Sequence, residues 1–442
     1  MRFLLFFCLF VSLLGAGELR IAATADLHGN LCNLAVLAPE LRKSKADIRI
    51  DAGDLVGGNQ IAEYDGGRSM TAALNMLKFD FRVPGNHDFE VHQSDFENRC
   101  REFRGITLGG EWKWGSTSGT AWHIFSKGKF RCGIIGLTEP DLQRRHLPTG
   151  DAPRFLPWEK VLRDAVNSLR RRKVNTIVLV WHNGIDARPN GISNVIRRFP
   201  EIDLVIAAHS HKENPGSRIG RSYVVQPGAY GTSAVLAKIF FDDRSFRISR
   251  IESLLMRGDV KKPAADLMKL KYHAEAPWHK IVNNKICRKG DLSAARLPFI
   301  GAKALAAAGN TQGAVFTVQT PQKEAAYLER CKDLYRILPF RNLLCTVELS
   351  SGELKALMKE LEYTSRRFNR RIGVCGFTYR RGKRKQPAFI AAPERISITV
   401  SDFTMTGSAV LRRIVSEDPR RWRKLDMVER DAVAKYLSMQ KQ

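Results

Sequence analysis

The chain has 442 residues, of which 44% are hydrophobic and 9% aromatic, and these values exclude a largely disordered protein. Its length is sufficient for two ordinary domains, each with its own core. The formal net charge of +27, from 72 Lys and Arg against 45 Asp and Glu, favours anionic partners such as nucleotides, nucleic acid or an acidic surface.

The first residues are typical of a secretory signal peptide. An early Arg is followed by an apolar run to Leu14 and then by the small residues 15–17. This run is shorter than the about 20 residues that a membrane-spanning helix needs. We therefore expect residues 1–17 to be a signal peptide, and the mature protein to be periplasmic or extracellular without a transmembrane segment. An uncleaved N-terminal anchor is the alternative.

The cysteines do not indicate a metal ribbon. Of the eight, Cys8 lies in the predicted signal peptide, and the others are scattered without a CxxC pair. Isolated cysteines are usually small buried hydrophobes, which is the expectation here. A Cys331–Cys345 disulfide is the alternative.

Short apolar runs alternate with amphipathic segments in the first part of the chain. The apolar runs predict buried strands at 19–25, 47–53, 79–85, 132–138, 175–181 and 202–208. Helical patterns lie between several of them, for example at 33–44 and 158–172, whereas 222–228 and 233–243 are strand-like without an intervening helix. This order predicts a mixed α/β sandwich in which helices cover the sheets.

The composition changes after the last of these runs. We predict a catalytic domain at 18–250, a polar and partly helical linker at 251–285, and a second α/β domain at 286–442. Three of the four strongly basic runs, which include 365–371 and 418–424, lie in the last fifth of the chain. These runs favour an anionic surface or nucleic acid as a further partner, and a solvated basic surface is the alternative.

Side chains of the metal-ligand type follow the predicted strands directly. They occur in the segments DLHGN, GDLVGG, GNHD, WH and HSH, and they are Asp26, His28, Asp54, Asn86, His182, His209 and His211. Because the carboxyl ends of neighbouring strands share one edge of a sheet, we expect these ligands to converge in one cleft.

Such a ligand set fits a pair of divalent ions. Two ions about 3.5–4 Å apart need a bridging carboxylate, and the short side chain of Asp54 can offer one oxygen to each. A mixture of His, Asp and Asn ligands suits Zn, Mn or Fe and suits Ca poorly. A single His after a strand is usually a surface residue, but five motifs that each close an apolar strand predict a binuclear site.

The ordered motifs resemble those of the calcineurin-like metallophosphoesterases. Their spacing and the QPGAYGTS stretch at 226–233 resemble the 5′-nucleotidase and periplasmic UDP-sugar hydrolase family. The resemblance covers residues 18–250. It implies an N-terminal four-layer α/β/β/α sandwich followed by a smaller C-terminal α/β domain that recognises substrate.

The resemblance also implies how the ligands are divided between the two ions. The first ion corresponds to the positions of Asp26, His28, Asp54 and His211. The second corresponds to those of Asp54, Asn86, His182 and His209. His87 corresponds to the residue that protonates or stabilises the leaving oxygen while a metal-bound hydroxide attacks phosphorus in line.

A carboxylate near His87 is expected to orient its ring. The nucleotidases usually have His-Glu-Phe-Asp at this point, whereas this chain has His87-Asp88-Phe89-Glu90, with the two acids exchanged. Asp88 and Glu90 are therefore both candidates for the catalytic carboxylate.

The second domain resembles the nucleotidase C-terminal domain more faintly. The blocks at 333–358 and 401–407 carry the resemblance, and in them Phe340 and Phe403 correspond to the two phenylalanines that clamp the nucleobase. Stacking of this kind contributes about 1–3 kcal/mol per base and tolerates any base. Ordinary core packing of the two rings is the alternative.

The Asn-Gly-Gly-Gly-x-Arg block of the family is absent. The segment FTVQTPQKE at 316–324 takes its place, and Lys323 is its nearest cation. Lys is a point charge and cannot give the two-pronged phosphate contact of Arg.

These features predict a secreted phosphohydrolase that uses two divalent ions to hydrolyse 5′-nucleotides or nucleotide-sugars. A phosphodiesterase that acts on 2′,3′-cyclic nucleotides or nucleic-acid fragments is the first alternative. A non-catalytic binding protein on a hydrolase scaffold is the second.

Overall fold

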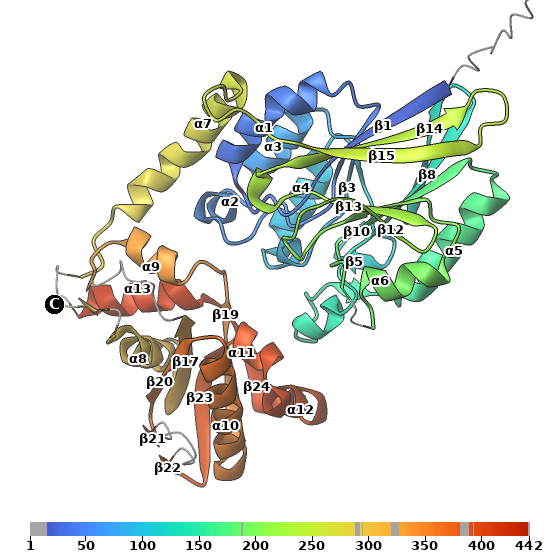
Figure 1. Ribbon diagram of the computed structural model, residues 1–442. Helices are drawn as coiled ribbons and strands as arrows, with labels where there is room; N and C mark the ends of the chain where they lie inside the picture. Colours follow the sequence, from blue (N-terminus) through green and yellow to red (C-terminus); the bar gives the residue numbers. More distant parts are fainter. Residues whose placement is uncertain are drawn as a thin grey trace, which may run out of the picture.

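The computed structural model describes residues 16–186, 189–287, 292–293, 295–319, 327–380, 389–391 and 393–440. It has two domains, which helix α7 (Ala265–Val282) connects (Figure 1). Apart from its last two residues, the predicted signal peptide lies outside the described residues. No helix in the described ranges has the length and apolar character needed to cross a bilayer.

Two six-stranded sheets form the centre of the N-terminal domain. The first has the order β15 (Ile248–Met256), β14 (Ala234–Asp242), β1 (Ala16–Thr24), β2 (Ile48–Asp51), β3 (Phe81–Arg82), β4 (Ile106–Thr107). The second has the order β12 (Asn214–Ile219), β13 (Ser222–Gln226), β11 (Leu204–Ala207), β10 (Thr176–Trp181), β8 (Phe130–Leu137), β7 (Trp122–Lys127). In each sheet the central strands are parallel, so their carboxyl ends lie at one edge.

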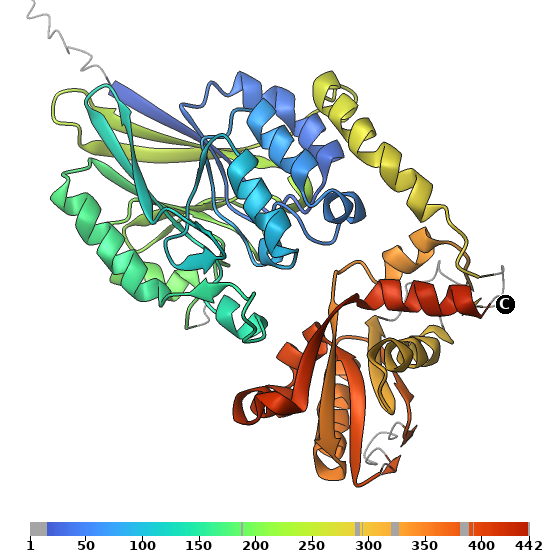
Figure 2. The same cartoon turned by 180° about the vertical axis from the view of Figure 1, so that it is seen from behind.

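The two sheets pack face to face around an apolar core, and helices cover their outer faces (Figure 2). On the first sheet lie α1 (Leu31–Lys43), α3 (Arg68–Met76) and α7. On the second lie α5 (Trp158–Arg171) and α6 (Ile192–Val195). In α5, Leu162, Val166 and Leu169 recur at helical spacing and are buried. The predicted four-layer α/β/β/α sandwich is thus confirmed.

A small third sheet accompanies the two large sheets in the N-terminal domain. It contains β6 (Thr117–Ser118), β5 (Trp112–Trp114) and β9 (Arg154–Phe155). Aromatic side chains of this sheet pack on α4 (Gln93–Glu102) and on the 3-10 turn η1 (His87–Phe89) through Phe89, Phe96, Trp112 and Trp114. This cluster gives the segment that carries His87 a rigid base.

The C-terminal domain is a five-stranded sheet with helices on both faces. Its strand order is β20 (Arg370–Cys375), β17 (Gly313–Gln319), β23 (Arg395–Ser401), β19 (Leu343–Ser350), β24 (Trp422–Val428). One face packs on α8 (Leu297–Gly309), α9 (Cys331–Ile337) and α13 (Glu429–Met439). The other packs on α10 (Ser351–Arg367), α11 (Asp402–Gly407) and α12 (Ala409–Glu417). The predicted second α/β domain is confirmed.

The cysteine alternative from the sequence is wrong. Cys345 is a free, buried thiol on β19, so a Cys331–Cys345 disulfide is not formed. The reason is that Cys345 packs on one face of the five-stranded sheet of the C-terminal domain, whereas Cys331 packs on the other face. Burial of Cys345, as predicted for an isolated cysteine, raises the pKa of its thiol.

The two domains contact each other beyond the connecting helix. A buried ion pair joins Arg430 to Glu63 at 2.6 Å, and Leu147 of the N-terminal domain packs with the core of the C-terminal domain. Strand β15 continues to Met256, past the boundary predicted at residue 250, because it pairs with β14 along its whole length. The domain boundaries stay a prediction.

Candidate metal centre

The loops that follow the parallel strands are joined by backbone hydrogen bonds at one edge of the sandwich. The Asp26 N–H donates to the Gly53 carbonyl at 2.8 Å, and the His28 N–H donates to the Asp54 carbonyl at 2.9 Å. The His209 N–H donates to the Asp26 carboxylate at 3.0 Å. Segments from both sheets are therefore fixed against one another, as the position of the strand ends predicts.

The backbone is strained where several of the predicted ligands lie. Asp26, His28, Asp54, His209 and His211 all have φ between 47° and 69°, which is the left-handed region that residues with a Cβ rarely adopt. Such conformations cost about 1–3 kcal/mol each and cluster at functional sites. This edge of the fold therefore maintains a geometry that stability alone would not select.

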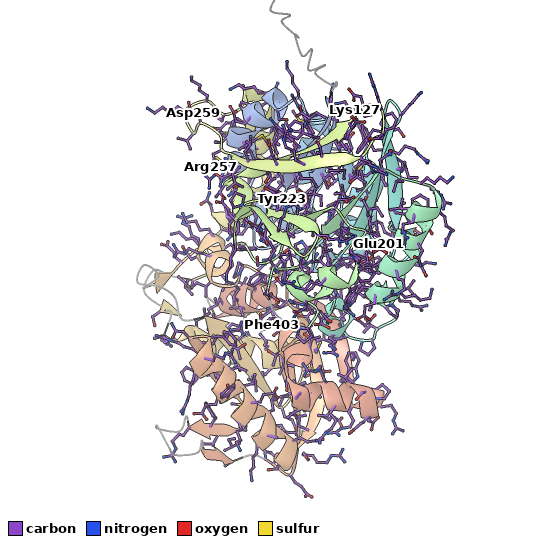
Figure 3. All side chains as sticks on the ribbon, turned by 45° about the vertical axis from the view of Figure 1, so that its right-hand side comes forward. Lys127, Glu201, Tyr223, Arg257, Asp259 and Phe403 are labelled. Atoms are coloured by element: carbon purple, nitrogen blue, oxygen red, sulfur yellow. The ribbon has the colours of Figure 1, made fainter. Side chains whose placement is uncertain are left out.

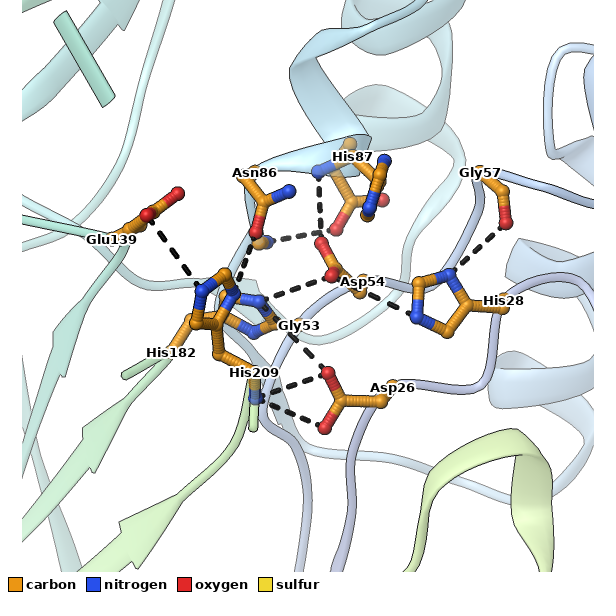
Figure 4. Close-up of polar contacts among 12 residues, drawn as sticks. Asp26, His28, Gly53, Asp54, Gly57, Asn86, His87, Glu139, His182 and His209 are labelled. Atoms are coloured by element: carbon orange, nitrogen blue, oxygen red, sulfur yellow. Dashed lines mark hydrogen bonds and ion pairs between the residues drawn. The ribbon is translucent and has the colours of Figure 1, made fainter. Parts of the chain in front are cut away.

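Three predicted ligands form a first cluster. His28 Nε2 lies 3.0 Å from His211 Nε2, and Asp26 Oδ1 lies 3.5 Å from His211 Nε2. His28 Nδ1 lies 3.0 Å from the Gly57 carbonyl, which makes Nδ1 the protonated nitrogen and leaves the Nε2 lone pair directed at the cluster (Figure 4).

The other predicted ligands form a second cluster beside it. His182 Nε2 lies 3.2 Å from Asp54 Oδ2, and His209 Nδ1 lies 2.9 Å from Asn86 Oδ1 (Figure 4). Asp54 Oδ2 is also 3.8 Å from His28 Nε2, so this carboxylate stands between the two clusters. Within each cluster the ligand atoms lie within 4.8 Å of one another. The first group is Asp26, His28 and His211, and the second is Asp54, His182 and His209.

The donor set fits divalent cations. His182 donates Nδ1–H to the Ala52 carbonyl at 2.8 Å, and its buried Nε2 faces the Asp54 carboxylate at 3.2 Å. A lone pair that faces a carboxylate is repulsive unless a proton or a cation lies between them. The carbonyl partners of His28 and His182 also orient the rings as is usual for histidines that bind metals.

The buried charges of the clusters lead to the same conclusion. Burial raises the pKa of Asp26 to about 7. Burial lowers the pKa of His182, but the adjacent Asp54 carboxylate outweighs this effect and raises it to about 10. Burial lowers the pKa of His28 to about 4, so this ring is neutral and able to act as a ligand. Bound cations would replace the protons that otherwise balance these carboxylates.

The two exchanged acids have different partners. Glu90 Oε2 lies 2.6 Å from His87 Nδ1, so the predicted contact between His87 and a carboxylate is present. Burial lowers the pKa of His87, but the charge of Glu90 and its hydrogen bond outweigh burial and raise it to about 9. Asp88 is 4% exposed and accepts hydrogen bonds from the Gly85 and Leu55 N–H groups. Asp88 therefore joins two loops, and it is Glu90 that meets the His87 ring.

Gly85 allows the close approach of these loops. A Cβ at this position would lie 2.2 Å from Asp54 Oδ1, which is well inside van der Waals contact. The same Asp54 oxygen accepts a hydrogen bond from the His87 N–H at 2.8 Å.

A cleft of about 370 Å³ extends from His87 to the C-terminal domain. Phe340 and Phe403 line it from that side, and they are 42% and 49% exposed, so the alternative of core packing is wrong for both. The Phe340 ring stacks on the His87 ring at 5.8 Å between centroids. Figure 3 shows Phe403 where the two domains face each other. Lys323 lies outside the described residues.

Sequence reasoning missed Glu139 and Tyr230. Glu139 follows β8, is 8% exposed, and lies 3.7 Å from His209 Nε2. The same rule that selected the other ligands, a polar side chain just after a buried strand, would have found it. The Tyr230 ring lies 5.1 Å from that of His28, and nothing in the local sequence pattern indicates this contact.

Comparisons with known proteins are consistent with this geometry. Residues 19–213 match the calcineurin-like phosphoesterase family. A snake venom 5′-nucleotidase of Crotalus adamanteus is 23% identical over 56% of the chain and 47% of its own length. A 2′,3′-cyclic-nucleotide 2′-phosphodiesterase/3′-nucleotidase of Haemophilus influenzae is 24% identical over 46% of the chain and 38% of its own length. The chain thus matches less than half of the length of these curated relatives.

The fold of the whole chain resembles a solved structure. The 5′-nucleotidase precursor of Thermus thermophilus superposes with a TM-score of 0.67 at 18% identity, covering 96% of this chain and 97% of that one. The similarity in fold therefore agrees with the matches in sequence. Residues 19–213 thus form a calcineurin-like phosphoesterase domain, and the matches in sequence and in fold support the predicted resemblance of the chain to the 5′-nucleotidases.

Proposed function

We propose that this protein is a secreted phosphohydrolase with two divalent ions, and that it hydrolyses the phosphoester of 5′-nucleotides or nucleotide-sugars. The observation that carries the proposal is the convergence of buried Asp and His ligands from both sheets beside His87. A binding protein on the same scaffold would gain nothing from this strained and charged arrangement, which makes the non-catalytic alternative the weaker one.

The ligand residues supply two adjacent cation sites. Asp26, His28 and His211 would hold one ion, and Asn86, His182 and His209 the other, with Asp54 shared between them. When bound, the ions would activate water and neutralise charge on the phosphoryl group. The His, Asp and Asn donors favour Zn, Mn or Fe.

His87 and Glu90 would handle the proton of the leaving group. Glu90 accepts the Nδ1–H of His87, so the proton available for transfer is at Nε2. The raised pKa of His87 keeps the ring protonated at neutral pH, which is the state needed to donate to a leaving oxygen.

Phe340 and Phe403 would bind the nucleobase. Because stacking on one ring contributes about 1–3 kcal/mol, Phe340→Ala or Phe403→Ala should raise KM for a 5′-nucleotide about tenfold. Neither variant should change KM for ribose 5-phosphate, which has no aromatic ring to stack. Steady-state phosphate release on the two substrates checks this, and equal changes in KM for both would contradict the clamp.

A phosphodiesterase that acts on cyclic nucleotides or nucleic-acid fragments is the second candidate. The observation that favours it is the cationic lining of the cleft, to which Arg144, Arg145, Arg341 and Lys424 contribute. If a polyanion is the substrate, its apparent affinity should fall steeply and linearly on a log–log plot as salt rises.

A phosphate-release screen tests the proposal. The protein is treated with a chelator, resupplied with Mn or Zn, and assayed on 5′-nucleotides, nucleotide-sugars and 2′,3′-cyclic nucleotides. We expect phosphate from 5′-nucleotides, and a nucleoside monophosphate with a sugar phosphate from nucleotide-sugars, both lost on chelation and restored by metal, with all products separated by chromatography. Turnover of cyclic nucleotides alone would support the second candidate, and no turnover of any phosphoester by metal-loaded protein would reject both.

Secretion belongs to the same proposal. It rests on the predicted signal peptide at 1–17, and fractionation of cells that express the full chain would test it by finding the protein outside the cytoplasm.

A further inference from the structure

An exposed aromatic ring, Phe368, lies near the predicted nucleobase clamp. Phe368 follows the last residue of α10, and its side chain is 55% exposed. Large apolar side chains that stand out into water singly are common, so exposure by itself carries no conclusion. The neighbours of Phe368 distinguish it from such cases.

One guanidinium group joins Phe368 to the clamp. The Arg370 guanidinium carbon lies 4.8 Å from the centre of the Phe403 ring and 5.9 Å from the centre of the Phe368 ring. Arg367 lies 5.5 Å from the centre of the same Phe368 ring. Planar guanidinium groups and aromatic rings are the groups on which nucleobases stack.

This arrangement is not part of the lining of the cleft. Phe403 and Phe340 line the cleft, whereas Arg370 and Phe368 are not among its lining residues. A nucleobase held between Phe340 and Phe403 would therefore leave the Phe368 ring available to a second base.

The charge around Phe368 suits a phosphate link between two bases. Within the described ranges, Arg367, Arg370 and Arg371 form no ion pair with a carboxylate, in contrast to Arg366 of the same segment, which pairs with Glu362 at 2.6 Å. Unpaired guanidinium groups beside exposed rings are typical of surfaces that bind single-stranded nucleic acid.

We propose that Phe368, Arg367 and Arg370 form an outer platform that stacks the second base of a 5′-phosphorylated dinucleotide, while its first base lies between Phe340 and Phe403. This inference rests on the proposed function and names its substrate class more closely. The preferred substrate would then be the 5′ end of a short oligonucleotide, from which the enzyme removes the terminal phosphate.

The experiment compares thymidine 5′-monophosphate with the 5′-phosphorylated thymidine dinucleotide. Phosphate release by the metal-loaded full chain is measured for the wild type, Phe368→Ala and Phe368→Trp. Tyr363→Ala is the matched control, because Tyr363 is an exposed ring on the same helix that makes no ring or cation–π contact with Phe368 or Arg370 in the described part of the chain. Binding of a fluorophore-labelled dinucleotide without metal is measured in parallel by anisotropy.

We expect the wild type to have a KM for the dinucleotide about tenfold below that for the mononucleotide, the effect of one stacked base. Phe368→Ala should remove this advantage and weaken dinucleotide binding by the same factor, without changing the mononucleotide KM. Phe368→Trp should retain the advantage, and Tyr363→Ala should change neither substrate.

Equal effects of Phe368→Ala on both substrates, or no effect on either, would overturn the platform while leaving the proposed function in place. Absence of phosphate release from every substrate would reject the proposed function, and the anisotropy measurement would then decide the platform independently. A dinucleotide whose two nucleosides are joined through a pyrophosphate is tested as an additional substrate. A lower KM for it than for the phosphodiester-linked dinucleotide would contradict the proposal that a phosphodiester joins the two bound bases.

Discussion

Asp54→Asn is expected to abolish phosphohydrolysis and to remove at least one bound ion. Asp54 is 1% exposed, and its carboxylate lies 3.8 Å from His28 of the first cluster and 3.2 Å from His182 of the second. An amide keeps the shape of the side chain but offers one neutral oxygen, so it cannot bridge two cations. Removal of the negative charge also lowers the affinity of each remaining His ligand set.

The measurement is metal content per chain after equilibration with Mn or Zn, together with phosphate release. Asp51→Asn is the matched control. Asp51 is equally buried on the same segment, but its carboxylate accepts its hydrogen bonds from Thr24 and from the Gly53 N–H. The bridge is refuted if Asp54→Asn protein retains both ions and full turnover.

His87→Gln should lower kcat by about 10²–10⁴ without loss of metal, because general acid catalysis contributes this much. Glutamine retains a polar group but cannot transfer a proton. The loss should be largest for a nucleoside leaving group, and much smaller for 4-nitrophenyl phosphate, whose leaving oxygen needs no proton. Measurement of kcat on both substrates, with metal content determined in parallel, tests this difference.

The two neighbouring acids give this experiment its controls. Glu90→Gln removes the carboxylate that lies 2.6 Å from His87 Nδ1, so it should show the same dependence on the leaving group to a smaller degree. Asp88→Asn alters the carboxylate that joins the loops at Gly85 and Leu55, so it should lower thermal stability and affect both substrates alike. An equal loss on both substrates in His87→Gln would show that His87 does not protonate the leaving group.

Much of the candidate centre could be predicted from the sequence, because its geometry follows from local order. Each predicted ligand stands within a few residues of the end of a buried parallel strand, and the carboxyl ends of such strands meet at one edge. Apolar runs locate those strands, and the residues after them are read directly. For this reason Asp26, Asp54 and His182 could be assigned to one site although they are far apart in the chain.

The features that the sequence left open depend on packing between distant segments. The exchange of Asp88 and Glu90 is visible in the sequence, but only the turn at η1 decides that Glu90 reaches the His87 ring while Asp88 turns inward to Gly85. The disulfide alternative failed for the same kind of reason, because the face of a sheet on which a cysteine packs depends on strand register.

By itself the sequence determined the class of fold, and it predicted the two domains and the ligands that close the strands of the sandwich. These follow from the alternation of apolar and polar residues over short distances. Only the tertiary structure decided that Phe340 lies against His87, that Phe403 shares Arg370 with Phe368, and that Glu139 lies beside His209. Such contacts join segments whose separation in the chain carries no information about their distance, since they form only when those segments pack together in the folded protein.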